Sequence, residues 1–144
     1  MPEQRINKEV RPLEVSKLLF DDQNFRFAES AEGESQKGLL KILNKDFDPL
    51  TIGESIADNG YFAEEPLVVI PKPSTDKYVV VEGNRRLAAL KFLLYEELRP
   101  LSGDPDSWED LAKRVKKDIS TVPCVAYPSR EELTIFLGYR HIVG

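Results

Sequence analysis

The chain has 144 residues and a formal net charge of -5, and 41% of its residues are hydrophobic. This length is sufficient for a core, and we expect residues 1–144 to form a single domain. The acidic balance argues against a domain that grips nucleic acid through overall charge, and a single cysteine excludes an internal disulfide framework. No apolar stretch approaches the length of a membrane span, so we expect a cytoplasmic protein.

The amino-terminal part begins irregularly and then becomes helical. Residues 10–20 mix apolar and polar positions, which predicts a short strand or a turn, and residues 21–35 are typical of a polar loop. From Ser35, a plausible N-cap, the leucines and isoleucines follow helical spacing. A second helix is predicted to open at Pro49 and to close before Gly60.

The central part predicts two strands followed by a buried helix. Residues 66–71 and 77–82 are rich in β-branched side chains and flank a turn, so we expect a hairpin. Residues 84–98 predict a helix that is apolar nearly all round and therefore central in the fold. Residues 98–108 contain prolines and glycine and predict a loop.

The carboxyl-terminal part predicts a charged amphipathic helix over residues 108–118 and a strand over residues 122–127. The apolar neighbours of Cys124 in that strand favour a buried thiol over a reactive one. A further helix is expected from Ser129, where Glu132 completes a capping box. The whole pattern predicts an α/β fold of the mixed α+β kind, in which one small mixed β-sheet packs against helices.

The stretch VVVEGNRRLAAL, residues 79–90, passes directly from a strand into a helix. Gly83 permits a sharp turn and the close approach of a ligand, and the N–H groups that open a helix can bind phosphate oxygens. Arg85 and Arg86 add positive charge where the helix dipole is already positive, so we expect an anion to bind there. Successive helical residues point about 100° apart, so one arginine is expected on the ligand and the other on an acidic neighbour. The alternative is an exposed helix start with solvated arginines.

This turn and three further segments, in the same order, resemble the ParB/sulfiredoxin superfamily. VVVEGNRRLAALKFL is similar to the family's signature turn, and NFRF, residues 24–27, stands where its first motif lies. Residues 54–70 resemble its passage from a helix through glycine into a strand, and residues 138–144 fall near its third motif. The resemblance spans residues 10–144 and implies a ParB N-terminal-like domain, which we expect to be a fragment of a longer protein.

The resemblance implies a nucleotide-binding regulatory domain that takes a nucleoside triphosphate, CTP or ATP, with Mg²⁺ as a further expected component. It also implies a DNA-associated protein, with DNA binding outside this chain. A helix predicted near residues 138–144 is expected to be poorly covered on one side, so a homodimer is a further expectation. The Glu-Asn pair with which partition proteins help to hold Mg²⁺ is absent ahead of Arg140, so no protein metal ligand is predicted. Asn84 stands where sulfiredoxin has cysteine, which argues against sulfiredoxin chemistry. Carried over residue by residue, the phosphate-binding set is Gly83, Asn84, Arg85, Arg86, Arg26, Arg140 and His141.

Two other functions stay open at this stage. One is an enzyme, either a nucleotide-dependent phosphotransferase or a ParB-like nuclease, and the other is direct binding of the DNA backbone. Glu82, beside the turn, is either a catalytic base or metal ligand, or a brace for an arginine. The acidic pairs at residues 21–22, 64–65 and 131–132 are either metal ligands or ordinary decoration of loops and helix starts. The aromatic pair at residues 61–62 either stacks on a base or packs in the core.

Overall fold

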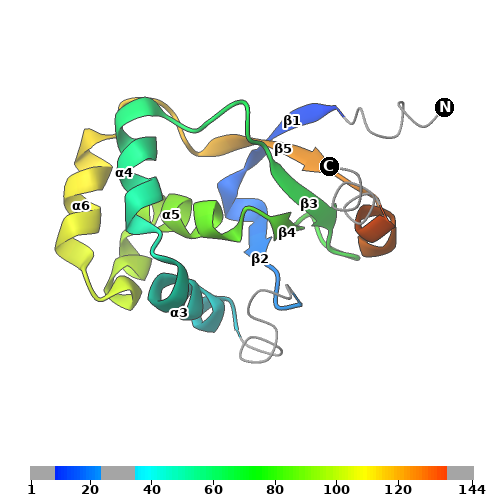
Figure 1. The fold of residues 1–144 in the computed structure, drawn as a ribbon, viewed down its shortest axis with the longest axis horizontal. Coiled ribbons are helices and arrows are strands. Elements are labelled where there is room, and N and C mark those ends of the chain that lie inside the picture. Colours follow the sequence, from blue (N-terminus) through cyan, green and yellow to red (C-terminus); the bar gives the residue numbers. More distant parts are fainter. Residues whose placement is uncertain (1–8, 24–34, 136–144) are drawn as a thin grey trace.

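A mixed five-stranded sheet organises the fold (Figure 1). The computed structural model describes residues 9–23 and 35–135. The strand order is β1-β5-β3-β4-β2, with β1–β5 and β3–β4 antiparallel and β2–β4 and β3–β5 parallel. The predicted α/β class, the hairpin and the single sheet are therefore confirmed. The strands are β1 (Val10–Glu14), β2 (Leu18–Phe20), β3 (Leu67–Pro71), β4 (Tyr78–Glu82) and β5 (Thr121–Ala126).

Helices cover one face of this sheet, and a smaller apolar cluster lies on the other. In Figure 1 helices α3 to α6 gather on one side of the strands, and the orange-red helix that begins at Arg130 lies on the other side. No helix in the described ranges is long and apolar enough to cross a lipid bilayer. The helices are α3 (Gln36–Phe47), α4 (Leu50–Asn59), α5 (Asn84–Leu94) and α6 (Pro105–Arg114), with short 3-10 helices η1 (Val15–Lys17) and η3 (Glu96–Ser102).

The two faces follow from the alternation of side chains along each strand. Val80 of β4 points into the larger core, and its neighbours Val79 and Val81 line the smaller cluster. Leu133, from the helix that begins at Arg130, is buried in that smaller cluster. The β-branched runs that predicted strands are thus apolar on both sides because both sides of the hairpin are covered.

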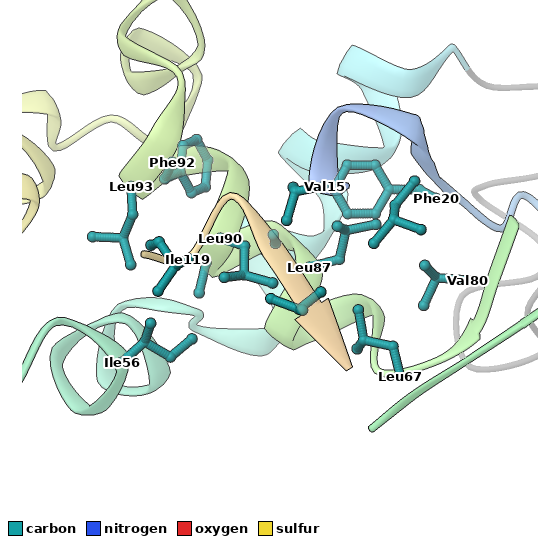
Figure 2. Close-up of a cluster of buried hydrophobic side chains, with 14 of the residues drawn as sticks. Val15, Phe20, Ile56, Leu67, Val80, Leu87, Leu90, Phe92, Leu93 and Ile119 are labelled. Carbon is teal, nitrogen blue, oxygen red and sulfur yellow. The ribbon is translucent and has the colours of Figure 1, made fainter. Parts of the chain in front are cut away.

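Helix α5 lies at the centre of the larger core, as its all-round apolar sequence predicts. Its residues Leu87, Leu90 and Phe92 are fully buried. Figure 2 shows Leu87 and Leu90 between Leu67 of the sheet and Ile56 of α4, and Phe92 beside Leu93. Burial of a large apolar side chain contributes roughly 1.5–3 kcal/mol, so this helix holds the sheet and the other helices together.

The predicted boundaries of two helices are wrong. Helix α5 ends at Leu94, not at residue 98, because the buried guanidinium of Arg99 donates hydrogen bonds to the carbonyls of Phe92 and Leu93. A cation at the carboxyl end of a helix satisfies carbonyls that have no partner within the helix. Helix α6 begins at Pro105, inside the predicted loop, since proline suits the first helical position.

Residues 10–20 form two strands at opposite edges of the sheet rather than one short strand or turn. The 3-10 helix η1 joins them, and its residue Val15 is fully buried in the core. The N–H of Val15 donates to the carbonyl of Ser120, 2.8 Å away. This connection brings the end of β2 beside β4 and thus beside the start of α5.

Lys91 of α5 provides a test of this packing. Its ammonium lies 5.7 Å from the ring centroids of both Phe20 and Tyr95. Burial, assisted by the charge of Lys77, lowers the pKa of Lys91 from 10.5 to about 8.

We expect Lys91→Met to raise the free energy of unfolding near pH 7, where the parent must bury a charged amine. The gain should shrink as the pH rises from about 8 to 10.5, because the unfolded chain holds more protons than the folded one in that window. Urea unfolding of both proteins across this range measures the difference. A difference that stays constant with pH contradicts the lowered pKa.

Candidate functional site

Gly83 forms the joint between β4 and α5. Its φ of 106° lies in the left-handed region, which glycine adopts without steric cost. A Cβ built on Gly83 would lie 2.3 Å from Cδ2 of Leu67, so the site has no space for a side chain. Gly83 is also the N-cap of α5, and it supplies no side chain to cap the helix. The first N–H groups of α5, at residues 84–86, therefore begin the helix without a side-chain cap.

Asn84 points into the protein rather than toward a ligand. The residue as a whole is only 5% exposed, and its Nδ2 donates to the carbonyl of Val80 over 2.8 Å. Its Oδ1 accepts a hydrogen bond from the N–H of Asp21 over 3.3 Å. The side chain thus joins β4, α5 and the end of β2, and only the main chain of Asn84 remains for the predicted phosphate contact.

Arg85 extends to the carboxyl end of α3. Its Nε and Nη2 donate to the carbonyl of Asp48 over 3.3 and 2.9 Å. Asp48 ends α3 in the left-handed conformation, and the carboxyl end of a helix dipole attracts a cation. We expected one arginine to bind an acidic side chain. Arg85 instead binds the main-chain carbonyl at the end of α3, so its guanidinium meets a carbonyl rather than a carboxylate.

Arg86 folds back over the turn. Its Nη1 donates to Oη of Tyr61 over 2.9 Å and to the carbonyl of Glu65. Its Nη2 lies 3.3 Å from the place where a Cβ on Gly83 would be, so the guanidinium sits against the glycine itself. Burial raises the pKa of Tyr61 to about 12, so its hydroxyl stays protonated at neutral pH and donates to Glu65 while it accepts from Arg86.

Glu82 does not brace either arginine. It ends β4 opposite Val68 and is half-buried. The ion pairs within residues 9–23 and 35–135 are Lys17–Asp76, Arg114–Asp58 and Arg130–Asp21, and Glu82 belongs to none of them. The expected brace is therefore not found, and a catalytic role for Glu82 stays a prediction.

An ion pair beside the turn was missed by sequence reasoning. Asp21, only 1% exposed, accepts hydrogen bonds from Nη1 and Nη2 of Arg130 over 3.0 and 2.9 Å. It also accepts from the N–H of Gln23 over 3.0 Å. Asp21 is thus neither solvated decoration nor a free metal ligand. The sequence did contain a signal for this ion pair. Arg130 opens a helix capped by Ser129, and a positive charge at a helix start, as at the start of α5, indicates an anionic partner.

Some predicted site residues lie outside the described residues, namely Arg26, Arg140 and His141, and their convergence on the turn stays a prediction. In the part of the chain that the structure does describe, no cluster of three or more His, Cys, Asp or Glu side chains could hold a metal ion. Cys124 is buried, as predicted, and burial raises its pKa to about 12.

The aromatic pair of residues 61–62 has its rings 5.8 Å apart, and both rings pack against the larger core. The hydroxyl of Tyr61 is engaged with Arg86 and Glu65. The pair therefore packs as the core alternative predicted, and the same packing fixes the position of Arg86.

No family model matches the chain, and no curated protein sequence does. A solved structure that it is similar to is the C-terminally truncated chromosome-partitioning protein ParB from Caulobacter crescentus, complexed with CTP-gamma-S. The two share 18% identity with a TM-score of 0.43, over 94% of this chain and 53% of that chain. This chain thus spans about half the length of the ParB chain. Because the identity and the TM-score are this low, we match no residue of the turn to a residue of ParB.

We expect Asn84→Ala to lower the free energy of unfolding by roughly 2–3 kcal/mol, because it leaves two groups, the buried carbonyl of Val80 and the N–H of Asp21, without this partner. Urea unfolding measures the loss. Asn44→Ala is the matched control, since it removes a single half-buried bond to the carbonyl of Ser102 that involves no residue of the turn, and it should cost about 1 kcal/mol. Equal losses in the two variants would contradict the role of Asn84 as a joint.

Proposed function

We propose that this chain is a nucleotide-binding regulatory domain of a ParB-like, DNA-associated protein, and that the turn from Gly83 to Arg86 holds the phosphates. The observation that supports this most is the open start of α5. Its N–H groups carry no side-chain cap, and the guanidinium of Arg86 lies against the glycine that precedes them. Main-chain N–H groups at a helix start, beside an arginine, are a recurrent phosphate-binding arrangement.

The charge balance at the turn supports an anionic ligand. Both arginines bind uncharged oxygens: Arg85 a carbonyl, and Arg86 a carbonyl and a phenol. Within the described ranges neither pairs with a carboxylate. Two positive charges and the positive end of the α5 dipole therefore lie together, with no ion pair from either arginine to a carboxylate of the described residues, and a polyphosphate would balance them.

The proposal is for binding rather than chemistry. Asp21, whose main chain contacts Asn84, has both carboxylate oxygens bonded to Arg130, so it does not offer a free base beside the turn. The DNA-associated role and the choice between CTP and ATP are supported only by the ordered sequence resemblance. We propose that DNA contacts lie outside this chain, in keeping with its net charge of -5.

Arg86→Ala should weaken nucleotide binding by roughly 1.5–3 kcal/mol, the contribution of a charge-assisted hydrogen bond. Calorimetric titration with CTP, ATP, GTP and UTP, with and without Mg²⁺, gives the dissociation constants. Arg86→Lys keeps the charge but loses the planar fork, so it should fall between the parent and the alanine variant. Arg114→Ala is the control, because Arg114 is an exposed arginine that pairs with Asp58 of α4 and should leave binding unchanged.

Circular dichroism on each variant separates loss of binding from loss of fold. Nucleotide binding that is equal in the parent and in Arg86→Ala would refute the phosphate turn. Release of inorganic phosphate or transfer of a phosphoryl group during the titration would instead favour the enzyme alternative. Binding of bare DNA that falls steeply with salt, without any affinity for nucleotide, would favour the DNA-backbone alternative.

A further inference from the structure

The ion pair between Asp21 and Arg130 connects distant parts of the chain beside the candidate site. The two residues are 109 positions apart, and both guanidinium Nη atoms bond to the carboxylate. Asp21 is 1% exposed at the side chain and Arg130 is 36% exposed. Two parallel hydrogen bonds to a buried carboxylate fix orientation as well as distance. The end of β2 is thus fastened to the first residue of the helix after β5.

The same end of β2 is fastened to the turn. The main-chain N–H of Asp21 donates to Oδ1 of Asn84, and Nδ2 of that amide holds the carbonyl of Val80. Asn84 is the first residue of α5, so its N–H is one of the uncapped groups proposed to bind phosphate. The order of contacts is therefore Arg130, Asp21 carboxylate, Asp21 main chain, Asn84 side chain, and then the turn.

Loss of Arg130 would reach the turn through Asp21. A carboxylate left buried without its cation is strongly disfavoured, so it must take up a proton or move toward water. Movement toward water carries the main chain of Asp21 with it and stretches its 3.3 Å hydrogen bond to Asn84. The donors at the start of α5 would then lose the position that a phosphate needs, because binding groups must be held within about half an ångström.

We propose that Arg130 and Asp21 are positioning residues for the phosphate turn: they set the placement of the α5 start without contacting the ligand. This inference rests on the proposed function. It assigns Arg130 a role that differs from that of Arg86, which is proposed to contact the phosphates itself. It also makes the affinity of the turn depend on a residue outside the segments that carry the sequence resemblance to known nucleotide sites.

The test compares Arg130→Met, Asp21→Asn and the double variant, each titrated with CTP and ATP at a temperature at which circular dichroism shows it folded. Arg130→Met should bind roughly five- to tenfold more weakly than the parent, within the coupling expected inside one hydrogen-bond network. Adding Asp21→Asn removes the stranded charge, so the double variant should recover to within about twofold of the parent. Hydrogen exchange at the Asp21 amide should speed up in Arg130→Met and slow again in the double variant.

Asp58→Asn is the matched control, because it breaks an Arg–Asp pair that is about half exposed and joins α4 to α6. It should leave the affinity unchanged. If Arg130→Met does not fold, Arg130→Lys, which keeps the charge and loses the bidentate fork, replaces it with a smaller expected loss.

The outcomes separate the two proposals. Weaker binding by Arg130→Met that Asp21→Asn does not rescue means that Arg130 contacts the ligand directly, and it overturns the positioning role. Unchanged affinity in Arg130→Met, with Arg86→Ala impaired, overturns the positioning role and leaves the phosphate turn standing. A parent that binds neither CTP nor ATP refutes the proposed function, and the positioning role with it.

Discussion

The contact between Gly83 and Leu67 is the constraint on which the arrangement of the turn depends. Cδ2 of Leu67 occupies the space that a side chain at position 83 would need. The main chain of Gly83, which follows β4, therefore lies directly against Leu67 of β3. The positive φ of Gly83 then turns the chain directly into the helix. No residue intervenes that could cap the helix with a side chain. An uncapped helix start beside the sheet is thus a consequence of core packing.

Two helices in the described part of the chain carry arginine in their first turn, and the difference between them is informative. Positive charge at a helix start is unfavourable by itself. At Arg130 the chain supplies its own anion, the buried carboxylate of Asp21. At Arg85 and Arg86 the partners within the described ranges are uncharged oxygens. Hydrogen bonds to carbonyl oxygens orient a guanidinium but do not neutralise its positive charge. The same electrostatic problem is therefore solved by a carboxylate of the chain at one helix, and at the other helix we propose that an external anion solves it.

The sequence predicted the elements whose signals are local. The β-branched runs predicted the hairpin, and the caps at Ser35 and Ser129 accept the expected N–H groups of Gly38 and Glu132. What could not be predicted depends on contacts between distant residues. Helix α5 stops at Leu94 because Arg99 turns back onto its carbonyls, although the leucine spacing continues to Leu98. Asp21 does lie in a loop, as predicted, but its burial and its ion pair could not be predicted because its partner lies 109 positions away.

The three side chains after Gly83 diverge as helical geometry requires, and each is held by a different segment. Asn84 turns inward, where an amide can both donate to Val80 and accept from Asp21; a carboxylate there would only accept and would face a carbonyl oxygen. Arg85 turns to α3, and Arg86 turns to the segment that holds Tyr61 and Glu65. An anion that arrives at this turn would therefore meet main-chain N–H groups and one edge of the Arg86 guanidinium. In the proposed function such a surface would recognise the geometry of phosphate oxygens, and segments other than this turn would set any preference for one base over another.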